Sequence, residues 1–147
     1  MRGFLLDVNA LIALLWRRHE HHEATQVWFA ESSSVGWATC SLTQLGFVRI
    51  TTNPAFSAEA VRPAQALAIL KANLEHPSHE AWEDRWGAAH LIEPLADRLV
   101  GHRQITDAYL LGLAAKYEGR LATLDGGIEA LARGGGPFAD LVERIPT

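Results

Sequence analysis

The stretch GFLLDVNALIALLW, residues 3–16, contains the clearest structural pattern of the sequence. Residues 3–6 are an apolar run, and Ala10, Leu11, Leu14 and Leu15 then recur at helical spacing, so the pattern predicts a buried strand that leads at once into a helix. Asp7 stands where one pattern changes into the other. A secretory signal would be an unbroken apolar stretch, and a membrane span needs roughly 20 apolar residues, so neither interpretation fits this segment.

Composition bounds the class of protein. The chain has 147 residues, of which 48% are hydrophobic and 20% charged, and we expect a single domain over residues 1–147. Cys40 is the only cysteine, which excludes an intrachain disulfide and predicts a reducing compartment. We expect a cytoplasmic protein that does not bind a membrane. The net charge of -4 leaves the partner open. Nearly all basic residues are arginines, whose side chains bind phosphate bidentately. A genome whose composition favours arginine and alanine explains this arginine content equally well.

The rest of the chain alternates strand and helix patterns. Strands are predicted at 35–40, within 79–86, at 120–125 and at 141–145, the last after a glycine run at 134–136. Helices are predicted at 22–31, from an N-cap at Ser41 to about Asn53, at 60–74 with Ser57 as cap, within 91–100, and at 107–117 with Thr106 as cap. This alternation is typical of βαβ units, so we expect an α/β domain with a parallel sheet covered by helices on both faces.

Two predicted strands end in an aspartate, Asp7 and Asp125. Ligands of parallel sheets bind beyond the carboxyl ends of the strands, and Asp107, in the first turn of a helix, reaches the same edge if that helix begins there. Each aspartate alone is explained as a helix cap. Two carboxylates about 4 Å apart, however, repel each other by on the order of 4 kcal/mol at an effective dielectric near 20. Three that converge therefore predict a hard divalent cation, Mg²⁺ or Mn²⁺, and a water activated for attack on phosphorus.

The chain resembles the PIN-domain ribonucleases, and in particular the VapC toxins of bacterial toxin–antitoxin modules, in three segments: LLDVNALIALL, TQLGFVR and ITDAYLLGLAAKYEGRLATLD. The resemblance covers essentially the whole chain. It implies a PIN-like three-layer α/β/α sandwich with a mainly parallel central sheet, and a metal-dependent endoribonuclease that cuts cellular RNA such as tRNA or rRNA. It also implies a VapB-like antitoxin and a homodimer. The family's acidic metal positions fall on Asp7, Asp107 and Asp125, with Asn9, Thr106 and Thr123 as polar neighbours.

One position departs from the family pattern. The second acidic residue of the family usually stands in a T-E-L-G-like segment, where this chain has Thr43-Gln44-Leu45-Gly46. Gln44 can offer an amide oxygen to a metal or to its water, but it carries no charge. We therefore keep Gln44 among the catalytic candidates and expect weaker binding, above all of a second metal.

Other features have plainer explanations. His19, His21 and His22 lack the spacing of a zinc site and are interpreted as a solvated helix start. Trp28 and Phe47 lie on apolar helical stripes and are assigned to the core, whereas Trp82 and Trp86, among charged residues, are predicted at a partner surface. Our candidates for contacts to RNA phosphates are Arg17 (or its neighbour Arg18), Arg49 and Arg103.

Two other functions stay open. Asp7-Val8-Asn9 after a strand is similar to the opening of haloacid-dehalogenase-like phosphatases, although Asn9 cannot shuttle a proton as their second aspartate does. Alternatively, Gln44 marks a PIN-like domain that binds RNA or an antitoxin without cleaving RNA. Metal-dependent cleavage of RNA, tested with a chelator, separates these alternatives from a nuclease.

Overall fold

The computed structural model describes residues 1–134 and 136–147. Its centre is a sheet of five parallel strands in the order β3-β2-β1-β4-β5. The strands are β1 (Phe4–Leu6), β2 (Trp37–Thr39), β3 (His79–Ala81), β4 (Arg120–Thr123) and β5 (Val142–Arg144). Within the sheet Leu5 of β1 lies opposite Ala38 on one side and Leu121 on the other.

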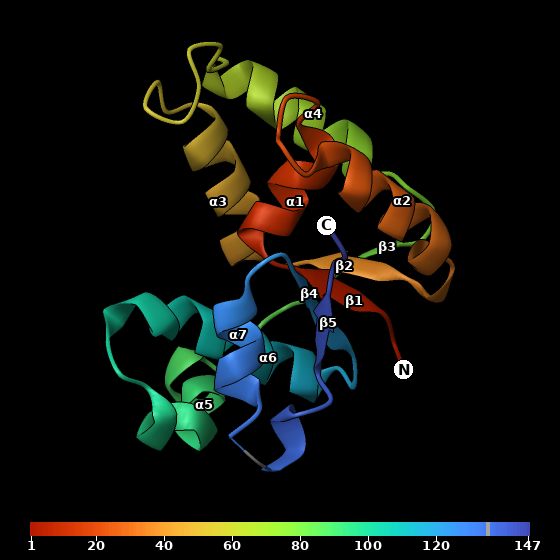
Figure 1. Cartoon of the computed structure of the whole chain (residues 1–147). Helices are drawn as coiled ribbons and strands as arrows, with labels where there is room; N and C mark the ends of the chain where they lie inside the picture. Colours follow the sequence, from red (N-terminus) through yellow and green to blue (C-terminus); the bar gives the residue numbers. More distant parts are fainter. Residues whose placement is uncertain (135) are drawn as a thin grey trace.

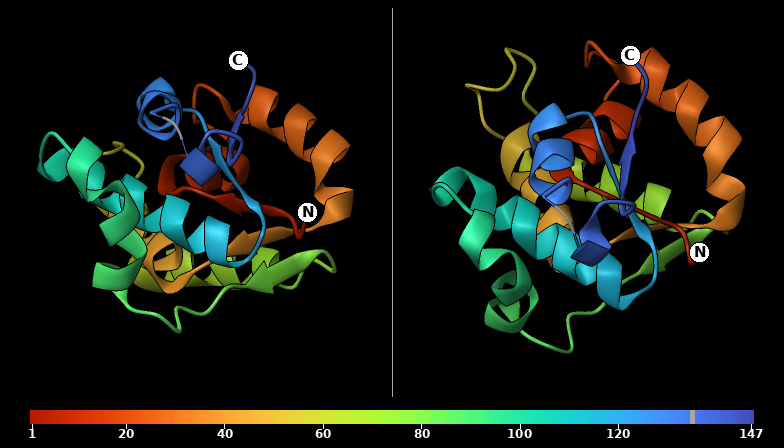
Figure 2. Two further views of the ribbon diagram at one scale, coloured as in Figure 1. Left: turned by 90° about the horizontal axis from the view of Figure 1, so that it is seen from below. Right: turned by 60° about the horizontal axis from the view of Figure 1, so that its bottom comes forward.

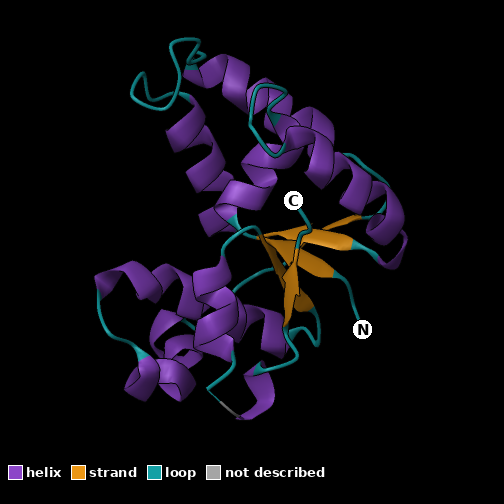
Figure 3. Cartoon of the chain, in the orientation of Figure 1, coloured by secondary structure: helices purple, strands orange, loops and turns teal. Residues whose placement is uncertain are grey.

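Helices cover both faces of this sheet (Figure 1). The described helices are α1 (Val8–Leu15), α2 (His22–Ser32), α3 (Ser41–Thr51), α4 (Pro63–Leu74), α5 (Ala88–Ile92), α6 (Ile105–Lys116) and α7 (Gly126–Ala132). Figure 3 shows the strands between two groups of helices. In both views of Figure 2, α5 and α6 again lie next to each other and apart from α2. The α/β/α sandwich with a parallel sheet, predicted from the sequence, is confirmed.

Alternate residues of β1 point to opposite faces and divide the core into two. Leu5 packs with Leu111 and other residues of α6 on one face. Phe4 and Leu6 pack on the other face with side chains of α1 to α4, among them Trp28 and Phe47. All six side chains are at most 6% exposed, so Trp28 and Phe47 are core residues as predicted. Because β1 is a central strand buried on both faces, its residues form an unbroken apolar run.

Three predicted helix caps are wrong. Cys40, not Ser41, occupies the N-cap position of α3, and its N–H donates to Thr43 Oγ1 at 3.0 Å. Helix α4 begins at Pro63, well after Ser57, because proline suits the first turn of a helix and cannot continue one. Helix α6 begins at Ile105 with Gln104 as N-cap, so Thr106 is already inside its first turn.

Two further differences concern the second half of the chain. Trp82 is 2% exposed and therefore does not lie at a surface. Its ring stacks on Tyr117 with centroids 4.7 Å apart, whereas Trp86 is half-buried and meets the same tyrosine edge-on. Helix α7 was not expected, and the glycine run at 134–136 falls partly outside the described residues. In the described part of the chain, no helix is long and apolar enough to cross a bilayer.

Candidate active site

An acidic hollow of about 420 Å³ opens at the carboxyl edge of the sheet. Asp7 reaches it from the end of β1, Asp125 from just beyond β4, and Asp107 from the first turn of α6. The hollow is lined by Asp7, Val8, Asn9, Thr106, Asp107, Leu110, Leu124 and Asp125. The structure thus brings the three predicted aspartates to one place, from three separate segments of the chain.

Asp7 is the most constrained of the three. Its side chain is buried, and it caps α1 because Oδ1 accepts the N–H of Ala10 at 2.8 Å. Its other oxygen, Oδ2, accepts the hydroxyl of Thr123 at 2.6 Å. Asp7 therefore both caps α1 and lines the hollow. One oxygen of its carboxylate accepts from the helix backbone, and the other accepts from Thr123.

Thr123 links the two strand-end aspartates. Its buried Oγ1 donates to Asp7 and accepts the N–H of Asp125 at 2.9 Å. Asp125 in turn caps α7, its Oδ1 accepting the N–H of Gly127 at 2.7 Å, while the residue itself stays exposed. The predicted polar neighbour Thr123 does not line the hollow; it lies behind it and fixes the orientation of Asp7.

The electrostatics of the hollow favour a cation. Burial, and then the charges of Asp125 and Asp7, raise the pKa of Asp107 to about 6. Burial raises the pKa of Asp7 to about 6 as well, although the hydrogen bonds from Thr123 and Ala10 act against the rise. No residue that lines the hollow in the described chain is basic, and none of the three aspartates pairs with a described cation. Among the described residues, no cation therefore balances the negative charge of the hollow.

The three aspartates offer carboxylate oxygens, which are the hard ligands that Mg²⁺ and Mn²⁺ prefer. Over residues 1–134 and 136–147, no three acidic, imidazole or thiol side chains are close enough to form a complete metal site by themselves. Mg²⁺ does not require one, because it is usually held by one or two carboxylates together with waters and substrate phosphates. The uncompensated carboxylates fit such an open site.

The other predicted site residues divide into two groups. Asn9 and Thr106 line the acidic hollow. Gln44 does not: its Nε2 donates to Thr39 Oγ1 at 2.9 Å, and its side chain lines a separate hollow of about 280 Å³ between α3 and α4. The candidate RNA contacts Arg17, Arg49 and Arg103 are exposed and do not line the acidic hollow. Arg17 lies in the loop between α1 and α2, Arg49 near the end of α3, and Arg103 in the short 3-10 helix His102–Gln104 before α6.

Two features of the acidic hollow were not predicted from the sequence. His19 approaches the site, with Nε2 placed 3.0 Å from Asn9 Oδ1, although the sequence suggested only a solvated position. No spacing rule could have found this contact, because it depends on how the loop after α1 folds back. Apolar walls are the second unexpected feature, formed by Val8, Leu110 and Leu124.

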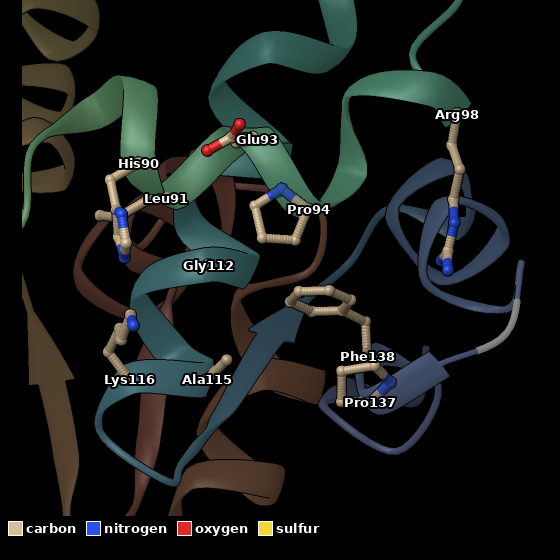
Figure 4. Close-up of a pocket in the computed structure, with 10 residues that line it drawn as sticks. All are labelled: His90, Leu91, Glu93, Pro94, Arg98, Gly112, Ala115, Lys116, Pro137 and Phe138. Carbon is tan, nitrogen blue, oxygen red and sulfur yellow. The ribbon is translucent and has the colours of Figure 1, made fainter.

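A second hollow of about 390 Å³ lies between α5, α6 and the short turn at 136–138 (Figure 4). Its walls include Leu91, Pro94 and Phe138, and His90 and Lys116 lie side by side along one border of it. None of the predicted site residues lines this hollow.

Comparisons with known proteins agree with the fold. Residues 4–134 match the PIN domain family. Ribonuclease VapC38 of Mycobacterium tuberculosis is 43% identical over 88% of this chain and 89% of its own length. Ribonuclease VapC29 of the same organism is 40% identical over 97% of this chain and 96% of its own.

Solved structures give the same fold. The structure of VapBC2 from Rickettsia felis bound to a promoter DNA fragment superimposes with a TM-score of 0.64 at 12% identity, covering 96% of this chain and 97% of that chain. FitAB bound to the IR36 DNA fragment gives 0.60 at 14% identity, over 96% of this chain and 94% of that chain. The chain belongs to the PIN-domain family and, within it, to the VapC ribonucleases. The resemblance noted in the sequence is thereby confirmed, and the phosphatase alternative is set aside.

Proposed function

We propose that this protein is an endoribonuclease that depends on Mg²⁺ or Mn²⁺ and acts as the toxin of a VapBC-type toxin–antitoxin pair. One observation carries the proposal: Asp7, Asp107 and Asp125 converge on one hollow without a basic neighbour among the residues lining it. Relatives named ribonucleases, similar over most of their length, support the same activity.

In this proposal the three aspartates hold the metal through carboxylate oxygens and waters. A bound Mg²⁺ or Mn²⁺ would neutralise the scissile phosphate and lower the pKa of a water that attacks phosphorus. Thr123 and the N–H of Ala10 keep the buried Asp7 carboxylate oriented at the hollow. Asn9 and Thr106 lie on the wall, where their side chains can donate hydrogen bonds to phosphate oxygens. Gln44 remains a candidate only if its side chain leaves Thr39.

The substrate we propose is a cellular RNA, either tRNA or rRNA. Arg17, Arg49 and Arg103 are proposed to contact its phosphates, and their exposure is consistent with that role. Alanine at a true phosphate contact weakens binding and reduces its salt dependence. An arginine whose replacement leaves the salt dependence unchanged is not a phosphate contact.

The proposed partners are a VapB-like antitoxin and a second copy of the chain, and the proposed location is the cytoplasm. Two structures of similar fold bear the names of two-component complexes, VapBC2 and FitAB, which supports the first partner. Co-purification with the product of a neighbouring small gene tests the antitoxin, and light scattering of the purified protein tests the homodimer.

The activity itself is tested with purified protein, total tRNA and purified rRNA. We expect cleavage with Mn²⁺ or Mg²⁺, loss of cleavage with EDTA, and recovery when metal is restored. Asp107→Asn should remove cleavage while circular dichroism shows an intact fold, because this half-buried side chain has no structural hydrogen bond in the described chain. RNA binding without cleavage under every metal condition would instead support the non-cleaving alternative.

A further inference from the structure

His19 lies in the loop between α1 and α2, and its ring is held at both nitrogens. Nδ1 accepts the backbone N–H of His21 at 3.0 Å. Nε2 lies 3.0 Å from Oδ1 of Asn9, a residue in the first turn of α1 that lines the acidic hollow. His19 itself is not part of that lining, and its contact with the lining is made through Asn9.

The contact at Nδ1 determines the tautomer of His19. A backbone N–H can only donate, so Nδ1 must carry a lone pair, and the proton of the neutral ring is then on Nε2. Nε2–H therefore donates to Oδ1 of Asn9. A doubly protonated ring would set a second N–H against that of His21, and burial followed by the charge of the His21 ring also lowers the pKa of His19.

The same logic orients the amide of Asn9. An asparagine amide has an oxygen on one side and an NH₂ donor on the other, and little torsional preference between its two orientations. Because the oxygen is taken by His19, the NH₂ group is the part left for the hollow. That orientation matters at this place, since an amide oxygen would repel the phosphate of a substrate, whereas NH₂ donates to it.

We propose that His19 is a positioning residue for RNA cleavage: it orients Asn9 so that the Asn9 NH₂ group donates a hydrogen bond to a phosphate oxygen of the RNA in the acidic hollow. The inference rests on the proposed ribonuclease function. The hydrogen bond exists both in the bound substrate and in the transition state, so its loss acts on KM more than on kcat.

The test compares His19→Ala, His19→Gln and Asn9→Ala with the unmodified protein. The probe is a fluorophore–quencher RNA hairpin that spans the site cut by the unmodified protein. We expect His19→Ala to raise KM by about tenfold with kcat changed by less than about twofold. Glutamine can donate through its own NH₂ and should recover most of the loss. His90→Ala, in the second hollow of Figure 4, is the matched control and should behave like the unmodified protein.

A double-mutant cycle separates positioning from a general structural effect. If His19 acts through Asn9, His19→Ala has no further effect in the Asn9→Ala background, because the group it orients is already absent. An equal rise of KM in both backgrounds, or an unchanged KM for His19→Ala alone, would overturn the proposal.

A second measurement does not depend on activity. In protein labelled with ¹⁵N histidine, the ring nitrogen shifts of His19, assigned by their loss in His19→Gln, should show the proton on Nε2. A proton on Nδ1 would overturn the proposal even if the kinetics agreed. If the unmodified protein cuts no RNA with either metal, the proposed function fails, and with it the role of Asn9 in cleavage, whereas the tautomer still reports on the positioning contact alone.

Discussion

Thr123 donates a 2.6 Å hydrogen bond to Asp7, although the two residues are 116 positions apart in the chain. The hydroxyl is fully buried at the end of β4, and the carboxylate is buried at the end of the adjacent strand β1. The same hydroxyl accepts the N–H of Asp125. Parallel pairing of β1 and β4 therefore does more than bring two aspartates to one edge: it couples them through a single side chain.

Thr123→Val tests this coupling. Valine keeps the shape of threonine but leaves Asp7 Oδ2 without its donor and the Asp125 N–H without its acceptor. Loss of buried partners costs about 1–3 kcal/mol, so we expect the free energy of unfolding to fall by that amount in urea titrations. The pKa of Asp7 should rise further, since the Thr123 hydrogen bond lowers it, and the pH profile of cleavage should move upward. Thr123→Ser keeps the hydroxyl and is the control; equal stability of the two variants would contradict the role of the hydrogen bond.

Asp7 predicts an unusual dependence of stability on pH in the absence of metal. Its pKa is 3.8 when unperturbed and about 6 in the folded protein, so the folded state binds the proton more tightly than the unfolded state. The resulting stabilisation is complete below pH 3.8 and is lost as the pH rises through about 6. Two pKa units correspond to roughly 3 kcal/mol. In EDTA we expect the stability of the unmodified protein relative to Asp7→Asn to fall by about that amount from about pH 4 to about pH 7.5.

Urea unfolding at several pH values measures this difference, and Asp97→Asn, at an exposed position, serves as the control. Adding Mn²⁺ at about pH 7.5 should restore the stability of the unmodified protein and not that of Asp7→Asn, because a ligand that binds only the folded state stabilises it. A pH-independent difference between the two proteins would show that the carboxylate is not titrating in this range.

Gly46 allows helix α3 to pack against the start of α1. A Cβ at this position would lie 2.7 Å from Cγ2 and 2.9 Å from Cγ1 of Val8, the residue that follows Asp7. Valine is stiff in a helix and cannot turn away, so Gly46→Ala should lower the free energy of unfolding by about 1–3 kcal/mol. It should also reduce cleavage, since any shift of α1 moves Asp7.

Val8→Ala supplies the missing space, so the double variant Gly46→Ala/Val8→Ala should be less destabilised than the sum of the single changes. Gly101→Ala is the matched control, because nothing lies within 4 Å of a Cβ there. Additive effects of the two single changes would mean that Val8 is not what resists the new methyl group.

Much of the fold could be predicted because it depends on local patterns. The change from strand to helix at Asp7 is visible in the sequence, and the shared edge of parallel strands then predicts that Asp7 and Asp125 meet. Helix α7 was not visible, because its first residues, Gly126 and Gly127, have low helix propensity, and the cap from Asp125 compensates for this only in the folded chain.

The remaining differences come from contacts between distant residues. Trp82 stands before Glu83, Asp84 and Arg85, a charged context that suggested a surface, yet its place is set by stacking on Tyr117. Gln44 stands where the family resemblance places an acidic residue, but the direction of its side chain is set by the hydroxyl of Thr39 at the end of β2. Sequence spacing carries no information on either partner.

Gln44→Glu gives the sharpest test of that last difference. Gln44 donates to Thr39 Oγ1, and the same oxygen lies 2.9 Å from Nε2 of His79, whose pKa is lowered mainly by burial. A glutamate at position 44 can only accept, so it competes with His79 for the hydroxyl proton and adds a negative charge beside the imidazole. We expect the pKa of His79 to rise in an NMR titration, while Mn²⁺ affinity, measured by calorimetry, changes by less than about twofold. A gain in Mn²⁺ affinity of about tenfold or more would instead show that the side chain at this position turns into the acidic hollow, as the family resemblance implies.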